Sequence, residues 1–312
     1  MRRSTGPTLA WVDPSSARHL QPVWVSRAGV ASPVTGVTPG DYRWPRVSPD
    51  GRRIAFGEIG KGIEVLDPAT GLRFVIAPSG PTEPVWLHDG RVVTSLQAGP
   101  HSFALLAHSA NGGRAPDTLR ALAARDAWPS DVSRDDGLLF YYSVPPGSDE
   151  QDIYILDMRT RAERQLARPG EQRGARLSPD GRWLAMESHV GARSDVIVMP
   201  WPAADAQYVV APDGGTEPTW SRDGKELFFR SGSRVMAVPV AAGSTWQARP
   251  PVELFHGPFA ADIWGDQSWD VAPDGRFLML QYTGDSRLRI RVIENWTTEL
   301  HQKLDGVAAP RP

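Results

Sequence analysis

Six residues recur at one position of a repeated motif, and their types could do binding chemistry. Each stands two residues before the residue that opens an Asp-Gly turn; the first copy of the motif reads "SPDGRRIAF" (48–56). In chain order the six are Arg46, Val85, Asp131, Arg176, Thr219 and Asp270. Arginine is a strong bidentate donor to carboxylates and phosphates. The four charged members predict either a structural ring of ion pairs or a polar site for an anionic or zwitterionic ligand.

The six positions divide into two matching halves. The order arginine, β-branched residue, aspartate occurs at 46, 85 and 131 and again at 176, 219 and 270. The middle copy of each half also carries the segment "TEP", at 82–84 and 216–218. We infer that the array grew by duplication of three motif copies.

The repeated unit must position these residues, and its length predicts its architecture. The copies lie at 48–56, 87–95, 133–142, 178–186, 221–229 and 272–280. Their spacing of roughly 40–50 residues is that of a four-stranded propeller blade. Glycine after aspartate suits a turn that needs a positive φ, so the Asp-Gly pair is a turn device before it is a metal or catalytic motif. The fold predicted is all-β, a six-bladed β-propeller of four-stranded antiparallel blades.

We predict one domain over residues 1–312. The blades span approximately 43–77, 82–123, 127–167, 173–211, 216–256 and 267–296. The segment 289–296 is the expected third strand of the last blade, and a strand within 8–25 is expected to close the ring. A short helix is predicted at 297–304, with Thr297 as its cap.

Composition excludes several classes of function. The chain has 312 residues and a net charge of −2, so no basic surplus points to nucleic acid. Cysteine is absent, which excludes disulfides, cysteine-ligated zinc and thiol catalysis. No apolar run is long enough to span a membrane. The start "MRRSTGPTLAWV" lacks the apolar core of a signal peptide, which favours the cytoplasm.

Candidate contact residues stand where the chain leads into each innermost strand, and in the long loop "ADIWGDQSW" (261–269). The loops that lead into innermost strands form one face of a propeller, so we expect a ligand or partner there and at the channel mouth. These residues are Arg43, Trp44, Glu83, Trp128, Arg173, Glu217, Trp264 and Trp269. The alternatives are that the glutamates are solvated rim carboxylates and that the tryptophans are blade-packing residues.

A metal site is an open alternative for the channel. The histidines show no H-x-H or H-E-x-x-H spacing, but residues from several blades can still gather on one metal. No cofactor is predicted, and a divalent metal in the channel stays an alternative. His88 replaces the proline of a turn, and we assign it to the surface.

The segments "SPDGRRIAF", "TEPTWSRDGKELFFRSGSRVMAV" and "APDGRFLML" resemble the PD40, or WD40-like, repeats of TolB-type six-bladed propellers. Their order also resembles the C-terminal propeller of bacterial membrane-anchored serine/threonine protein kinases. The likeness runs from Thr8 to about Leu304. It implies a bacterial sensor or scaffold propeller that binds a protein, a peptide or a small molecule. The kinase likeness implies association with a kinase or signalling chain and a periplasmic or cell-surface location.

The motifs of related enzymes are missing from the sequence. It has no glycine-rich loop with a strand lysine, no H-R-D, no D-F-G and no G-x-S-x-G. The α/β domain that precedes the propeller in TolB has no counterpart here. The predicted function is therefore a non-catalytic protein- or ligand-binding propeller. The alternative is a hydrolase or lyase with a metal-dependent site in the central channel.

Overall fold

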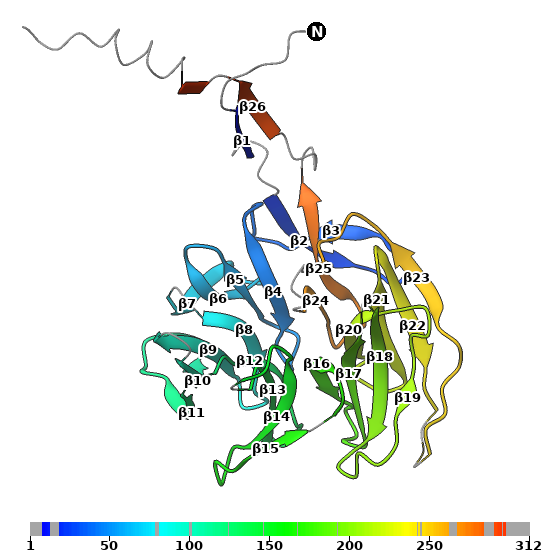
Figure 1. The fold of residues 1–312 in the computed structure, drawn as a ribbon. Helices are drawn as coiled ribbons and strands as arrows, with labels where there is room; N and C mark the ends of the chain where they lie inside the picture. The colour runs from blue at the N-terminus through cyan, green and yellow to red at the C-terminus, as the bar shows by residue number, and fades with distance from the viewer. Residues whose placement is uncertain are drawn as a thin grey trace, which may run out of the picture. The chain divides into compact units, whose positions relative to one another are not determined.

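The computed structural model shows an almost entirely β-stranded chain (Figure 1). It describes residues 8–12, 19–78, 81–99, 102–123, 125–145, 147–166, 168–191, 193–241, 243, 245–261, 267–283, 290–294, 296 and 297. The chain divides into two compact units, one of residues 20–281 and a smaller one of residues 1–19 and 282–312. The larger unit contains the repeats and is the six-bladed propeller.

Five blades are each built from one continuous stretch of chain, with strands in sequential antiparallel order. Blade 1 contains β4 (Tyr42–Val47), β5 (Ile54–Glu58), β6 (Gly62–Asp67) and β7 (Leu72–Ala77). Blade 2 contains β8 (Pro81–Trp86), β9 (Arg91–Gly99), β10 (Ser102–Ser109) and β11 (Asp117–Leu122). Blade 3 contains β12 (Trp128–Val132), β13 (Leu138–Ser143), β14 (Asp152–Asp157) and β15 (Glu163–Leu166). Blade 4 contains β16 (Glu171–Leu177), β17 (Trp183–Val190), β18 (Arg193–Pro200) and β19 (Tyr208–Val209). Blade 5 contains β20 (Thr216–Trp220), β21 (Glu226–Ser231), β22 (Arg234–Pro239) and β23 (Val252–His256).

The sixth blade combines two strands from near the C-terminal end of the chain with two from near its N-terminal end. Its order is β24 (Trp269–Val271), β25 (Phe277–Thr283), β2 (His19–Val25) and β3 (Ala31–Pro33). The prediction that 289–296 supplies its third strand is wrong. Instead β26 (Ile290–Glu294) pairs with β1 (Thr8–Val12) in a separate two-stranded sheet. The reason is burial: β2 buries Val23 and Val25 in the blade core, whereas Val292 of β26 is 57% exposed.

The Asp-Gly motif is a turn, as its residue types predict. Ser48 Oγ donates to Asp50 Oδ1 at 2.6 Å, and the same carboxylate oxygen accepts the amide of Arg52 at 3.0 Å. The hydrogen bond from Ser48 lowers the pKa of Asp50. Gly51 adopts a φ of 74°, which a glycine reaches without a steric penalty. The serine–aspartate bond recurs in the turns of blades 3, 4 and 5.

Apolar clusters between neighbouring blades hold the array together. The cluster between blades 2 and 3, for example, packs Leu105 against Tyr141 and Leu156, all fully or almost fully buried. Burial of this kind supplies most of the stabilisation of a propeller core.

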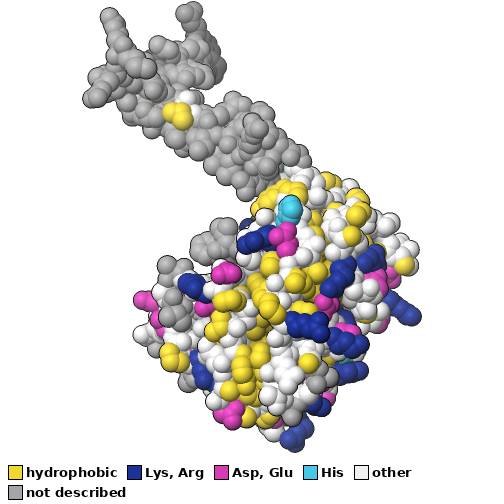
Figure 2. Space-filling view, turned by 90° about the vertical axis from the view of Figure 1, so that its right-hand side faces the viewer, with side chains coloured by type: hydrophobic (Ala, Val, Ile, Leu, Met, Phe, Trp, Pro, Cys, Tyr) yellow, Lys and Arg dark blue, Asp and Glu magenta, His cyan; other side chains and the backbone are white. Residues whose placement is uncertain are grey.

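On the face drawn in Figure 2, lysine and arginine side chains lie in separate groups among acidic, apolar and uncharged ones.

Each of the first five innermost strands contains a β-bulge near its start. The register shifts lie at Arg43/Arg46, Thr82/Val85, Pro129/Asp131, Arg173/Arg176 and Thr216/Thr219. A bulge redirects the side chains that follow it. Trp44 and Glu217, inside two of these bulges, have φ values of 51° and 55°, a conformation that non-glycine residues rarely adopt. The bulges therefore determine where the next residues, including the predicted ring, point.

Outside the propeller, Trp296 and Thr297 are helical, and the rest of the helix predicted at 297–304 lies outside the described residues. Among the residues that the structure describes, no helix is long and apolar enough to cross a membrane.

Candidate functional site

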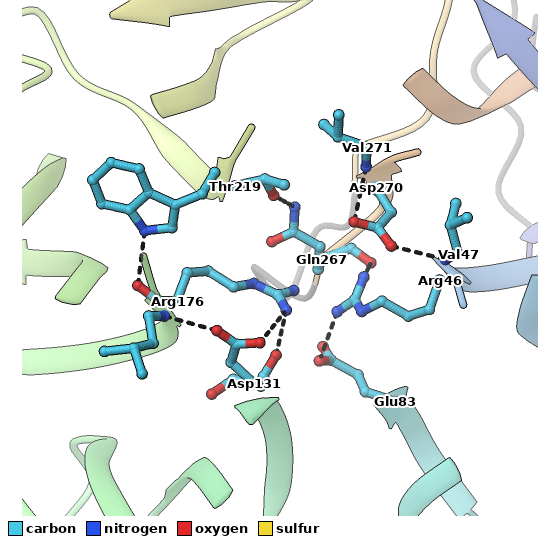
Figure 3. Close-up of polar contacts among 12 residues, drawn as sticks. Arg46, Val47, Glu83, Asp131, Arg176, Thr219, Gln267, Asp270 and Val271 are labelled. Atoms are coloured by element: carbon cyan, nitrogen blue, oxygen red, sulfur yellow. Dashed lines mark hydrogen bonds and ion pairs between the residues drawn. The ribbon is translucent and has the colours of Figure 1, made fainter. Parts of the chain in front are cut away.

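The six positions aligned by the motif meet in the central channel. Each is on or beside an innermost strand of a different blade, and all six line one cavity of about 120 Å³. They are Arg46, Val85, Asp131, Arg176, Thr219 and Asp270. Figure 3 shows the polar members converging from opposite sides. The structure thus brings together the whole of the predicted polar ring.

The two aspartates join neighbouring blades through the backbone. Asp270 Oδ2 accepts a hydrogen bond from the amide of Val47 at 2.8 Å, and Asp131 Oδ2 accepts one from Leu177 at 2.7 Å. The cross-blade arginine–aspartate pairing is weaker, because Arg176 lies 4.0 Å from Asp131. Burial raises the pKa of Asp131, against the opposing attraction of Arg176. The carboxylates are thus mainly structural acceptors for the next blade.

Arg46 is the most deeply buried member of the ring. Its side chain is 4% exposed, and its Nη2 lies 3.5 Å from Glu83 Oε2. Its Nη1 donates to the carbonyl of Gln267 at 3.4 Å. Burial, and next the positive charge of Arg176, lower the pKa of Arg46 to about 10. Arg176 in turn donates to the carbonyl of Ser130.

Two indole groups fix the backbone of these arginines in matching ways. Trp86 Nε1 donates to the carbonyl of Arg46 at 3.1 Å, and Trp220 Nε1 donates to that of Arg176 at 3.0 Å. The two bonds are related by a shift of three blades. The three-blade period of the sequence therefore corresponds to a repeated set of contacts around the channel.

The mouth of the channel is formed by the Asp-Gly turns. A second cavity, of about 250 Å³, shares lining residues with the first and is bordered by one turn residue from every blade. These residues are Pro49, His88, Arg134, Pro179, Arg222 and Pro273. Arg222 Nε donates to the carbonyl of Val271 at 3.0 Å, so blade 5 also contacts blade 6 here. Sequence reasoning did not select Arg134 or Arg222, although their place in the motif identified them as turn residues.

His88 is exposed, as predicted, and it also borders the channel. It lines both cavities, and its Nδ1 lies 3.1 Å from Asp136 Oδ1. The same carboxylate accepts the backbone amides of His88 and Asp89. Asp136 stands where the turns of blades 1, 4 and 5 have glycine: its amide donates to the carbonyl of Ser133, and its φ is 53°. An aspartate in place of this glycine provides the carboxylate that contacts the turn of blade 2.

Three of the predicted contact residues are buried. Glu83 and Glu217 are each 2% exposed, and Trp269 is fully buried in the core between blades 5 and 6. Glu217 accepts hydrogen bonds from the amide and hydroxyl of Ser268, at 2.7 and 2.6 Å. Burial raises the pKa of Glu217 to about 7. The expectation that these residues are open to a partner is wrong, because residues of the next blade cover Glu83 and Glu217 and the apolar core encloses Trp269.

The other predicted contact residues lie apart from the two channel cavities. Arg43, Trp44 and Arg173 are half-buried, and Trp128 stacks on Tyr142 with ring centroids 5.2 Å apart. The predicted contact residue Trp264 lies outside the described residues.

The described part of the chain contains no group of three or more histidine, aspartate or glutamate side chains that could hold a metal ion. Of these residue types, the lining of the inner cavity holds Asp131, Asp270 and His88, and His88 Nδ1 lies 3.1 Å from Asp136 Oδ1 in the turn of blade 3. The divalent metal in the channel therefore stays an alternative without a ligand set among the described residues.

Comparison with solved structures defines the class of fold. No protein-family model matches the sequence, and no curated protein matches it. A protein of Agrobacterium tumefaciens assigned as TolB is similar over 86% of this chain and 99% of its own, with 18% identity and a TM-score of 0.64. TolB of Acinetobacter baumannii is similar over 90% of this chain and 68% of its own, with 16% identity and a TM-score of 0.55. The oligogalacturonate lyase of Vibrio parahaemolyticus covers 90% of this chain and 97% of its own, with 12% identity and a TM-score of 0.55.

The chain is thus a six-bladed β-propeller with TolB-like structural neighbours. The same fold occurs in the lyase. At these identities the likeness shows the fold and does not identify the activity, which has to be argued from the site. The narrower likeness to the kinase propeller stays a prediction.

Proposed function

We propose that this chain is a non-catalytic binding propeller, and that it holds an anionic part of its ligand or partner at the channel mouth formed by the Asp-Gly turns. The observation that carries the proposal is the lining of the two joined cavities, to which every blade contributes. Four arginines face two aspartates there, Arg46, Arg134, Arg176 and Arg222 against Asp131 and Asp270, and Arg46 is also paired with Glu83. This balance of charge favours an anionic group.

The bonding of these groups supports binding rather than chemistry. The carboxylates of Asp131 and Asp270 accept backbone amides of the next blade, which holds them in structural hydrogen bonds. Arginine stays protonated in proteins and does not exchange protons during a reaction. A pocket of fixed guanidinium groups therefore suits recognition of a negative charge.

The enzymatic alternative is a hydrolase or lyase that uses a metal in the channel. No observation on the described residues favours it, and the similarity to a lyase concerns the fold alone. Elemental analysis of the purified protein, with a chelator-treated control in a thermal shift assay, tests it directly. A stoichiometric metal whose removal lowers the melting temperature would support the alternative.

The binding proposal is tested with an array of acidic, neutral and basic peptides. We expect the wild-type protein to retain acidic peptides, and the double variant Arg134→Ala/Arg222→Ala to lose them. The matched control is Arg234→Ala/Arg249→Ala, which removes the same charge from exposed positions of blade 5. Arg134 is exposed, so Arg134→Ala alone keeps the test valid if loss of Arg222 prevents folding. Retention that is independent of peptide charge, or unchanged in the mouth variants, would refute the proposal.

A further inference from the structure

We infer that the inner cavity binds a carboxylate group between Arg46 and Arg176. The inference rests on the proposed function, because it gives the chemistry of the group that enters the same mouth. In Figure 3 the two guanidinium groups point toward one another from opposite sides of the channel, and both line the cavity of about 120 Å³.

The first argument is an excess of donors. The Nε atoms of Arg46 and Arg176 are buried, and neither has a hydrogen-bond partner among the residues that the structure describes. A buried donor without an acceptor costs free energy, so such groups normally have a partner. These two belong to side chains that are 4% and 11% exposed. The Nε atoms of Arg73, Arg120 and Arg230 also lack a hydrogen-bond partner among the described residues, so what distinguishes Arg46 and Arg176 is that both line one cavity. A carboxylate in that cavity would supply two acceptor oxygens to their guanidinium groups.

The second argument is that the acids of the channel are already engaged. Asp131 and Asp270 each accept an amide of the next blade, and Asp270 Oδ1 also accepts its neighbour's amide at 2.8 Å. Glu83 accepts from Tyr142 at 3.3 Å besides its pairing with Arg46. A guest anion can therefore approach both arginines without displacing the amide hydrogen bonds of Asp131 and Asp270.

The third argument is electrostatic. Burial, and next the positive charge of Arg176, disfavour the charged form of Arg46, against the attraction of Glu83, Asp270 and Asp131. An anion placed between two like charges in a poorly hydrated channel interacts favourably with both. Charge-assisted bonds from arginine to a carboxylate are also among the strongest hydrogen bonds in proteins.

The shape of the channel indicates what kind of molecule bears the carboxylate. The inner cavity has a volume of about 120 Å³. Pockets for drug-sized ligands are larger, at roughly 300–1,000 Å³. The inner cavity opens into the mouth cavity of about 250 Å³ through shared lining residues. A slender chain that ends in a carboxylate fits this arrangement. The C-terminus and an acidic side chain of a peptide share that chemistry.

Small anions test the carboxylate site on the intact chain. We expect acetate to raise the melting temperature more than uncharged acetamide does, at an ionic strength balanced with sodium chloride. Arg176→Gln should weaken acetate binding about ten- to a hundredfold, because charged hydrogen bonds are lost. Arg176→Lys keeps the charge but not the guanidinium geometry. It should bind acetate more weakly than the wild type and more tightly than Arg176→Gln. Arg234→Gln is the control and should bind acetate like the wild type.

Three outcomes would overturn the inference: equal effects of acetate and acetamide, equal binding by Arg176→Gln and the wild type, or stronger stabilisation by phosphate or sulfate than by acetate.

A peptide retained on the array separates this inference from the proposed function. That peptide is measured in three forms: with a free C-terminal carboxylate, with a C-terminal amide, and with each glutamate changed to glutamine. Loss of binding in one arm supports the carboxylate and identifies its source. Equal binding in all arms would overturn the carboxylate while the binding function stands, and a failure of every peptide to bind would overturn both.

Discussion

Asp270 accepts the backbone amide of Val47 at 2.8 Å and so joins the last blade to the first across 223 residues of sequence. Asp131 makes the equivalent bond to Leu177, between blades 3 and 4, at 2.7 Å. The two bonds are separated by three blades, like the arginines and the indoles beside them. The residues of the ring therefore serve two purposes, since the aspartates connect blades and the arginines face the cavity.

The first prediction concerns this connection. Asp270→Ala should lower the free energy of unfolding by about 1–3 kcal/mol, because the amide of Val47 is left without its acceptor. Asp270→Asn retains an acceptor oxygen and should lower it less. The measurement is urea denaturation, with Asp205→Ala in an exposed loop as control. An Asp270→Ala protein as stable as the control would contradict a role in closing the ring.

The second prediction concerns the paired indoles. Trp86→Phe and Trp220→Phe each keep an aromatic ring but remove the donor to the carbonyl of Arg46 or Arg176. Each should cost about 1 kcal/mol of unfolding free energy. Because the two bonds share no residue, the double variant should show the sum. Urea denaturation of the three variants provides the check, and strong non-additivity would show that the two halves of the ring are coupled.

The third prediction concerns close packing at the bulge of blade 1. A Cβ added at Gly57 would lie 2.8 Å from Trp44, closer than real contacts allow. Gly57→Ala should therefore lower the free energy of unfolding by about 1–3 kcal/mol. Gly99→Ala is a matched control, since its Cβ would meet Ser102 at an ordinary 3.8 Å. Thermal unfolding compares the two, and equal melting temperatures would show that Trp44 moves aside without cost.

The fourth prediction is a dependence of stability on pH. Burial raises the pKa of Glu217 from its ordinary 4.5 to about 7, so the folded protein holds this proton more tightly than the unfolded chain. The stabilisation from this group is present at low pH and decreases as pH rises from 4.5 through about 7. Glu217→Gln cannot ionise and should lack this component.

Urea denaturation of the wild type and Glu217→Gln over this pH range measures the effect. The stability of the wild type relative to the variant should fall as pH rises. Glu150→Gln, in an exposed loop, should keep the wild-type profile. A difference between wild type and Glu217→Gln that stays constant with pH would contradict the raised pKa.

The repeat was sufficient to predict most of the fold and part of the site. Arg46, Asp131, Arg176 and Asp270 were placed together because one motif position faces the axis in every blade. The contact of His88 with Asp136 was not predicted, because it joins the turns of two neighbouring blades. A position within one motif does not reveal such a partner.

The contact residues could be predicted less well. Glu83 and Glu217 stand at strand starts, where a carboxylate is usually solvated, yet they are buried. Tyr142 covers the first and Ser268 the second, each from the following blade. Sequence patterns describe one strand at a time, so they could not show what the neighbouring blade places over it.

The sequence by itself determined the number of blades, the turns between their strands and the residues that face the axis. These follow from local rules: a period that matches one blade, Asp-Gly chemistry in the turns and alternation along each strand. The tertiary structure alone decided that β2, and not 289–296, is the third strand of the sixth sheet, that the two glutamates are covered, and that the cavities lie among the Asp-Gly turns. Each of these depends on contacts between residues far apart in the chain, which form only when the blades pack around a common axis.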